Sequence, residues 1–327
     1  MIVSESIARL NSANISNHPM FKDIDETRFA EIKRLIDNRV MQLVAIASDI
    51  NRSYGYTLLA NPFGKANNNT KIRKSLGIDG YATASLSLAP SDTASVFSER
   101  YENLCPMAKR AKCESVCLMS SGLGGIHSNA AIGRLAKSVF FIDHKNLFVS
   151  LLRRELDRFE VACKKRGLDA AARLNVLTDI LWERMGLVED YPKIQFYDYT
   201  KIATRGVSSA WKMMMDNYDV THSLSWSITK IDDFRYLDSS RRYAMVVCQF
   251  TYDRLFKVNP NAKYHMADNA VYANATGTIP MVFVNGDIHD LTFLHPVGTV
   301  LVLKAKGRAR KPNDFVYYFS PCIWSEI

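Results

Sequence analysis

Three cysteines in one short segment have the most specific chemistry of any residues in this chain. Cys105, Cys113 and Cys117 lie close together, and basic residues stand between the first two. Thiolates are soft ligands that prefer zinc or iron over magnesium, and neighbouring cations favour the deprotonated sulfur. The segment therefore predicts a metal site, with structural thiols that bind nothing as the alternative.

Two kinds of metal centre suit three thiols. A structural zinc site needs a fourth protein ligand, for which His127 is the nearest candidate. A 4Fe–4S cluster held by three cysteines leaves one iron open to a substrate or to S-adenosylmethionine. Glycines let the backbone approach a cofactor closely, and such glycines follow soon after the thiols: Gly122, Gly124 and Gly125. We expect the iron–sulfur centre with S-adenosylmethionine, and zinc as the alternative.

Polar residues at the ends of predicted strands form a second set of candidates. In α/β barrels, the side chains that follow the strands line the active site. The predicted catalytic residues are Asn175, Asp198 and Lys201, and the predicted cofactor-binding residues are Ser223, Ser225, Lys304 and Lys306. The alternative places the serines on an exposed sheet face and Asp198 in a turn or helix cap.

A third set suits a harder metal ion. Asp287, His289 and Asp290 offer carboxylate and imidazole ligands in one short stretch. Such ligands bind divalent cations that support hydrolysis of phosphodiesters. We therefore keep a nuclease as an alternative function. The other interpretation of this stretch is a solvated turn that binds no metal.

Alternating helices and strands predict an α/β fold. Apolar residues recur at three- and four-residue steps over Thr27–Ile50 and again over Ile132–Phe159, as in amphipathic helices. Strands are expected at 84–89, 172–176, 193–199, 220–228, 244–250, 279–285 and 299–304. Strands separated by helices favour a parallel sheet, and their spacing favours a partial or complete (βα)n barrel. We expect residues 1–55 to form an N-terminal helical extension and residues 56–327 the barrel-like domain.

The position of the cysteines makes the predicted barrel resemble that of a known class of enzymes. Radical S-adenosylmethionine enzymes carry such a loop after the first strand of a partial α/β barrel. Their most common spacing is Cys-x3-Cys-x2-Cys, whereas this chain has Cys-x7-Cys-x3-Cys. The resemblance implies a radical-SAM-like fold and concerns topology, not the exact motif.

Composition and charge narrow the class of protein further. The chain has 327 residues, of which 47% are hydrophobic and 23% charged, so it can bury a large core. Apolar runs stay below the ~18 residues of a membrane span, and the first residues lack a secretory signal. Lys and Arg number 42 against 33 Asp and Glu, a net charge of +9. Such a surplus favours polyanionic partners, and it is concentrated in Lys65–Lys74 and Lys304–Lys311.

Ordered short motifs over most of the chain resemble those of the phage gene product 88 family. They include Leu86-Ser-Leu-Ala-Pro90, Cys105-Pro, Arg173-Leu-Asn175, Phe196-Tyr-Asp-Tyr-Thr-Lys201 and Gly286-Asp-x-His-Asp290. Val176 stands where the family usually has glycine, and Gly122-Leu-Gly124 replaces a Gly-Arg-Gly. The resemblance implies a phage protein of the host cytoplasm and brings no established biochemical function.

Two functions from different classes follow. The first is a divergent radical-SAM-like iron–sulfur enzyme that acts on a nucleic-acid or nucleotide substrate. The second is a metal-containing nucleic-acid-binding protein of phage replication or host takeover, with nuclease activity as its catalytic variant.

Overall fold

A computed structural model describes most of the chain. The described residues are 3–12, 19–21, 23–51, 55, 57–63, 70–120, 127–206, 216–225, 240–256, 264–265, 271–274, 277–280 and 282–317. The chain forms two compact units. The first contains Met1–Pro106 and Cys117–Ile194, and the second contains Met107–Val116 and Gln195–Ile327. Helices of the predicted N-terminal extension fall within the first unit, and the division after residue 55 stays a prediction.

Helices dominate the described part of the first unit. They are α1 (Val3–Ser12), α2 (Glu26–Ser48), α3 (Thr70–Ser75), α5 (Ser128–Asp143) and α6 (Lys145–Lys164). Short 3-10 turns stand at η2 (Pro19–Phe21), η3 (Ile78–Gly80), η4 (Thr93–Val96), η6 (Leu118–Ser120) and η7 (Trp182–Met185). None of the helices in the described residues is long and apolar enough to cross a membrane.

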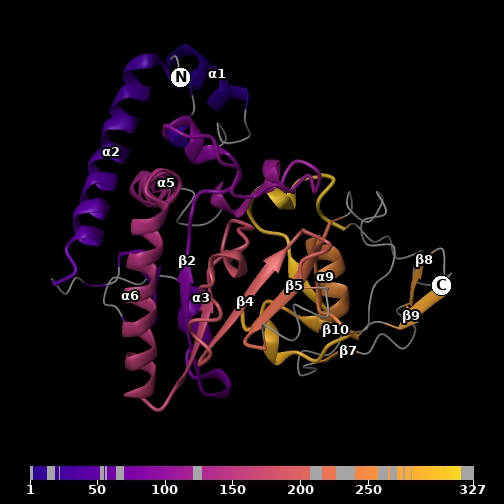
Figure 1. Cartoon of the computed structure of the whole chain (residues 1–327). Helices are drawn as coiled ribbons and strands as arrows, with labels where there is room; N and C mark the ends of the chain where they lie inside the picture. Colours follow the sequence, from indigo (N-terminus) through magenta and orange to yellow (C-terminus); the bar gives the residue numbers. More distant parts are fainter. Residues whose placement is uncertain are drawn as a thin grey trace. The chain divides into compact units, whose positions relative to one another are not determined.

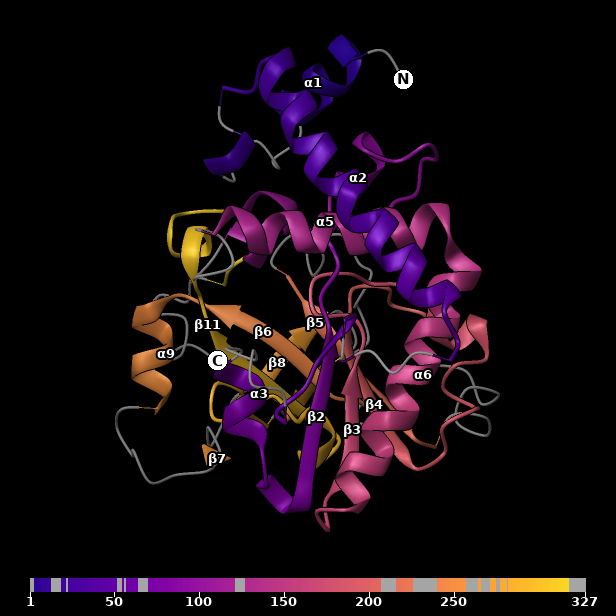
Figure 2. The same ribbon diagram turned by 90° about the vertical axis from the view of Figure 1, so that its left-hand side faces the viewer.

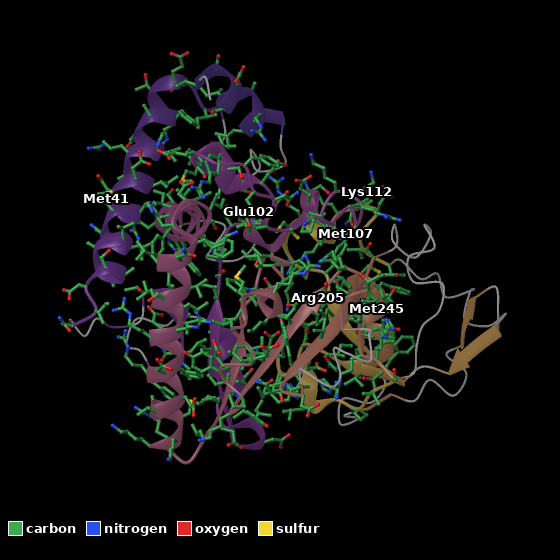
Figure 3. The ribbon with its side chains drawn as sticks, viewed as in Figure 1. Met41, Glu102, Met107, Lys112, Arg205 and Met245 are labelled. Atoms are coloured by element: carbon green, nitrogen blue, oxygen red, sulfur yellow. The ribbon has the colours of Figure 1, made fainter. Side chains whose placement is uncertain are left out.

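Helix α2 confirms the amphipathic pattern predicted for Thr27–Ile50. Asp25 caps its N-terminus by accepting a hydrogen bond from the Arg28 backbone N–H at 2.7 Å. Its buried stripe consists of Phe29, Ile32, Ile36, Val40, Leu43 and Ala47. This stripe packs mainly on α5, which α2 crosses diagonally (Figure 2). The opposite face is solvated, and Met41 on that face is 66% exposed (Figure 3).

The second predicted helix is two helices, which corrects the single stretch expected over Ile132–Phe159. At His144 the backbone leaves the helical region, with φ −128° and ψ 46°. Its N–H still donates to the Phe140 carbonyl at 3.0 Å, so α5 ends at this residue and α6 begins directly after it. In Figure 1, α5 is seen end-on, whereas α6 runs vertically in the plane of the picture. Hydrophobic periodicity missed the break because both helices bury their apolar stripes.

A buried carboxylate attaches the strands of the first unit to its helices. Strands β1 (Leu59–Ala60) and β2 (Tyr81–Leu86) pair antiparallel, and β2 pairs in parallel with β3 (Asp169–Arg173). Glu155 of α6 is fully buried and accepts hydrogen bonds from the backbone N–H groups of Thr57, Leu58 and Leu59 at 2.7–3.1 Å. These charge-assisted bonds fix the start of β1 against α6.

The second unit is built on a mostly parallel sheet. Its strands are β4 (Ile194–Thr200), β5 (Tyr218–Leu224), β6 (Tyr243–Val247), β7 (Tyr264–His265), β10 (Val282–Asn285) and β11 (Thr299–Lys304). They are hydrogen-bonded in the order β4-β5-β6-β11-β10-β7, and every pair except β10–β7 is parallel. A separate hairpin joins β8 (Val271–Asn274) to β9 (Gly277–Pro280). The remaining elements are α9 (Gln249–Phe256), η5 (Glu114–Val116), η8 (Thr292–Leu294) and η9 (Gly307–Arg310).

These strands confirm the α/β class and the parallel pairing. Within each unit, the described strands form an open run that does not close on itself. The predicted strand over 244–250 is too long, because β6 ends at Val247 and α9 begins at Gln249. The apolar run Ala244–Phe250 predicts one strand, although its last two residues, Gln249 and Phe250, are helical.

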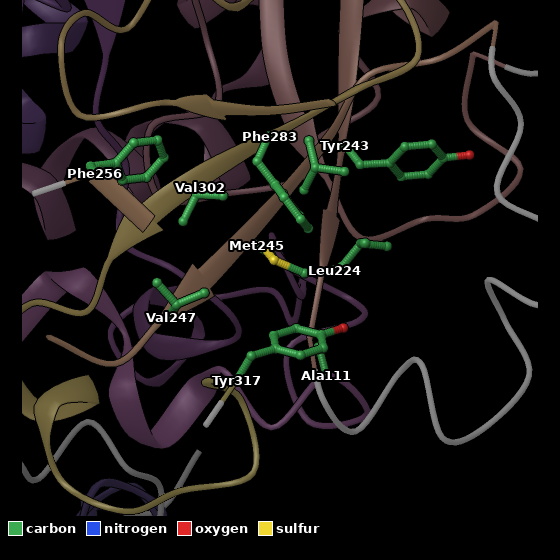
Figure 4. Packing of buried hydrophobic residues seen from close by; sticks show 10 residues of the cluster. Ala111, Leu224, Tyr243, Met245, Val247, Phe256, Phe283, Val302 and Tyr317 are labelled. Carbon is green, nitrogen blue, oxygen red and sulfur yellow. The ribbon is translucent and has the colours of Figure 1, made fainter. Parts of the chain in front are cut away.

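The core of the second unit collects residues from segments far apart in the sequence. Tyr243, Met245 and Val302 of the sheet pack with Tyr317 and with Ala111. Figure 4 shows Ala111 beside the Tyr317 ring. The short segment 107–116 is therefore part of this unit, although its neighbours in sequence belong to the first.

Candidate functional site

Two basic segments of the second unit are held together by a small apolar cluster. Val116 of one segment packs with Ala305, Ala309 and Val316 of the other, all less than 9% exposed. The helical turns η5 and η9 meet at this cluster. We call the cations that these segments carry the basic edge: Lys109, Arg110, Lys112, Lys304, Lys306, Arg308, Arg310 and Lys311.

The first of these segments is a single helical turn that ends at Lys112. The Ala111 N–H donates to the Met107 carbonyl at 2.9 Å, and the Cys113 N–H donates to the Ala108 carbonyl at 3.2 Å. Lys112 itself adopts a left-handed backbone, with φ +54°. That conformation ends helical turns and is more often taken by glycine. The Lys112 side chain is exposed at the surface (Figure 3).

The second segment is fixed by Asp287. Its Oδ1 accepts a hydrogen bond from Lys306 Nζ at 2.5 Å, and its Oδ2 accepts one from the Lys304 backbone N–H at 2.9 Å. Gly286, the residue before it, donates its N–H to the Val302 carbonyl at 3.0 Å. The structure thus brings Asp287, Lys304 and Lys306 together, and Asp287 positions the cationic segment.

The other members of the predicted hard-metal set have different surroundings. The His289 ring stacks on the His295 ring, with centroids 4.8 Å apart and planes 4° apart. Asp290 is buried, at 8% exposure. No group of three or more His, Cys, Asp or Glu in the described part of the chain is arranged to hold a metal ion.

The three predicted thiol ligands divide between the two units. Cys113 belongs to the second unit, and its Sγ lies 3.6 Å from the Ala108 carbonyl oxygen. Cys105 and Cys117 belong to the first unit. Cys105 is buried and donates its N–H to Asn103 Oδ1 at 2.9 Å. None of the three forms a disulfide within the part of the chain that the structure describes, and a metal centre at these positions stays a prediction.

Asn175 holds a loop of the first unit by its side chain. Its Oδ1 accepts hydrogen bonds from Thr178 Oγ1 and the Ile180 N–H, both at 2.9 Å, and from Trp182 Nε1 at 3.2 Å. Its Nδ2 donates to the Ile180 carbonyl at 2.9 Å. These bonds fold residues 175–182 around the amide, so the structure gives Asn175 a structural role. A catalytic role for it stays a prediction.

Asp198 lies in a buried polar network of the second unit. Tyr218 donates its hydroxyl to Asp198 Oδ2 at 2.5 Å, and Arg205 Nη2 donates to the Tyr218 hydroxyl at 2.5 Å. The Asp198 and Arg205 side chains are each 1% exposed and lie 4.0 Å apart. The Arg205 carbonyl in turn contacts His222 Nε2 at 3.0 Å.

This network keeps its histidine neutral. Burial, together with the charges of Arg241 and Arg205, lowers the pKa of His222 to about 4. Sequence reasoning found Asp198 but missed its partners, because no local motif marks Arg205 or Tyr218. A buried ion pair of this kind is as consistent with a structural role in the sheet as with a catalytic role.

Aromatic side chains stand among the cations at the carboxyl ends of the strands. Lys304 Nζ lies 5.6 Å from the centre of the Tyr252 ring, and Lys201 Nζ lies 5.9 Å from that of Phe315. Phe250, in the first turn of α9, is 58% exposed. The prediction of a strand over 244–250 concealed this residue, because a short apolar run does not show where a strand ends and a helix begins.

The remaining predicted cofactor-binding residues are two serines and three glycines. Ser223 at the end of β5 is 8% exposed, and Ser225 just after it is fully buried. They do not lie on an exposed sheet face. Gly122, Gly124 and Gly125 lie outside the described residues.

These features define an α/β protein with a mostly parallel open sheet and a cationic, aromatic-bearing strand edge. The family model described as gene product 88 matches residues 59–318. The chain therefore belongs to the gene product 88 family, the phage family expected from its motifs. Searches of curated proteins and of solved structures give no match.

Proposed function

We propose that this protein binds nucleic acid through the basic edge of its second unit. The observation that carries the proposal is the assembly of the edge from two segments far apart in the sequence. Val116, Ala305 and Ala309 bury their side chains to hold those segments together. This packing brings cations together against their mutual repulsion. A polyanion bound at the edge would offset that repulsion.

The exposure of the cations supports this function. Lys109, Lys112 and Arg310 are exposed, whereas Lys304 and Lys306 are partly buried. Cations of this kind bind phosphates in exchange for released counterions, so affinity falls steeply with salt. The carboxylate of Asp287 pairs with Lys306 and so offsets one of the charges of the edge until a ligand competes for that lysine.

The test removes exposed charges without disturbing the fold. The variant combines Lys109→Gln, Lys112→Gly and Arg310→Gln. Glycine at position 112 suits the positive φ found there. The control combines Lys164→Gln, Lys165→Gln and Lys193→Gln, which removes the same charge from exposed positions of the first unit.

Binding of a fluorescent oligonucleotide is measured over a range of salt concentrations. The basic-edge variant should bind about tenfold more weakly or worse, with a salt slope shallower by roughly two to three, since each phosphate contact contributes about 0.7–0.9. The control variant should match the wild type. Absence of wild-type binding at low salt, or equal loss in both variants, would contradict the proposal.

A second candidate is an iron–sulfur enzyme of the radical-SAM-like type, with a barrel completed from the parallel strands. The cysteine segment follows β2, which pairs in parallel with β3, and precedes α5. Such a strand–loop–helix position suits a ligand loop. In this candidate Cys105, Cys113 and Cys117 would hold the cluster, with Ser223, Ser225 and Lys304 toward S-adenosylmethionine.

Anaerobic reconstitution with iron and sulfide tests this candidate. The wild type should develop broad visible absorbance and an EPR signal on reduction, and Cys113→Ser should lose both. Stoichiometric zinc without iron would instead support the zinc alternative.

A further inference from the structure

We infer that the basic edge receives single-stranded nucleic acid, and that the Phe250 ring stacks on one of its bases. This inference rests on the proposed function and names its ligand class. It starts from an aromatic ring, 58% exposed, in a chain whose other large aromatic rings are mostly buried in the described part. A phenyl ring held in water is an unfavourable apolar surface that a flat partner would cover.

Phe250 lies in the first turn of α9, which begins two residues after β6 ends beside Lys304. Val247, three residues before it, pairs in register with Lys304, and the Val247 carbonyl accepts the Ala305 N–H at 2.9 Å. Lys304 also places its Nζ 5.6 Å from the Tyr252 ring of the same helix. Phe250 is thus carried by the helical turn that adjoins the cationic segment.

The helix that carries Phe250 is firmly held. Tyr252 donates its hydroxyl to Asn285 Oδ1 at 2.7 Å, and Phe256 at the end of α9 is part of the core cluster. The Cys248 sulfur lies 3.2 Å from the Thr251 hydroxyl. A ring presented on such a fixed helix loses little conformational freedom when a base stacks on it.

The geometry favours a single strand over a duplex. In a duplex the faces of the bases are covered by their neighbours, so a duplex offers the edge only its phosphates. An unpaired strand offers both phosphates for the lysines and base faces for the aromatic ring, which is how sequence-tolerant single-strand binding arises. Ile288, 50% exposed and next to Asp287, adds apolar surface close to the cations.

The experiment separates base stacking from phosphate binding. Three labelled ligands are compared by fluorescence anisotropy: a thymidine oligomer, an abasic oligomer with the same number of phosphates, and a duplex of equal length. The proteins are the wild type, Phe250→Ala and Phe250→Tyr, with Tyr101→Ala as control because Tyr101 is exposed to a similar degree, 60%, in the first unit. Thermal unfolding verifies that each variant is folded.

Phe250→Ala should weaken binding of the thymidine oligomer by about tenfold and leave the abasic oligomer unchanged. Phe250→Tyr should restore binding, and Tyr101→Ala should bind like the wild type. If Phe250→Ala matches the wild type on the thymidine oligomer while the basic-edge variant loses binding, the stacking inference fails and the proposed function stands. If the wild type binds none of the three ligands, both fail.

Discussion

Lys306 and Asp287 form the ion pair that joins the end of β11 to the end of β10. Lys306 Nζ lies 2.5 Å from Asp287 Oδ1, and the Lys304 backbone N–H donates to the second carboxylate oxygen. Both carboxylate oxygens of Asp287 thereby accept hydrogen bonds from residues of the basic edge. This arrangement gives the residue a positioning role at the cationic segment and leads to a first prediction.

Asp287→Asn should change stability and binding in opposite directions. Loss of the partly exposed ion pair should lower the free energy of unfolding by about 1 kcal/mol. Loss of the negative charge should strengthen oligonucleotide binding at low salt, because Lys306 is released toward the ligand. Urea unfolding and anisotropy measure the two effects. The nuclease alternative predicts magnesium-dependent cleavage that Asp287→Asn abolishes, and such cleavage would give Asp287 a catalytic role instead.

Gly286→Ala should destabilise the second unit. A Cβ at this position would lie 2.8 Å from Leu303 Cδ2 and 3.2 Å from Leu301 Cβ. Overpacking of this kind costs about 1–3 kcal/mol of unfolding free energy. Gly133→Ala on α5 is the matched control, since the nearest atom to its Cβ would be Arg39 Nη1, the end of a long side chain, at 3.6 Å. That control should be neutral or stabilise the helix by up to about 1 kcal/mol. Equal melting temperatures for the two variants would speak against the close packing.

Asn175→Ala should act on stability. The substitution removes the acceptor of three hydrogen bonds and one donor, and leaves buried partners unsatisfied. We expect a loss of about 3 kcal/mol in unfolding free energy, measured by chemical denaturation. Asn175→Asp keeps the acceptor oxygen but buries a charge, so it should also destabilise. A fully stable Asn175→Ala protein would point back to the catalytic role expected from the sequence.

Stability should fall in mild acid because of His222. Its folded pKa is lowered to about 4, below an unfolded value of about 6.5. Between these values the unfolded chain binds the proton and the folded chain does not, so unfolding becomes easier as the pH falls. Above pH 6.5, His222 does not lower the free energy of unfolding. As the pH falls toward 4, protonation of His222 in the unfolded chain lowers that free energy by up to about 3 kcal/mol.

The matched variant His222→Gln isolates this effect from other titrating groups. His295, whose pKa burial also lowers to about 4, stays in both proteins. The difference in unfolding free energy between the wild type and the variant should therefore change with pH between 6.5 and 4. A constant difference over that range would show that His222 has the same pKa in the folded and the unfolded protein.

Local patterns in the sequence determined the class of fold and several elements. The apolar period of α2 and the strand Thr299–Lys304 are local signals, because burial on one face repeats with the period of the element. The charge surplus and the family motifs are likewise properties of the sequence itself. Local signals could not show that the helix predicted over Ile132–Phe159 ends at His144, since both helices bury a similar stripe.

Only the tertiary structure decided which residues meet. Segment 107–116 packs in the second unit because Ala111 and Val116 find apolar partners there, and this contact assembles the basic edge. Similarly, the parallel pairing of β4 and β5 brings Tyr218 to Asp198, and the turn after β4 brings Arg205 to both. The exposure of Phe250 follows from the end of β6 at Val247. Contacts between distant segments depend on the packing of the whole unit, so residue types and spacing along the chain predict the candidates but not their partners.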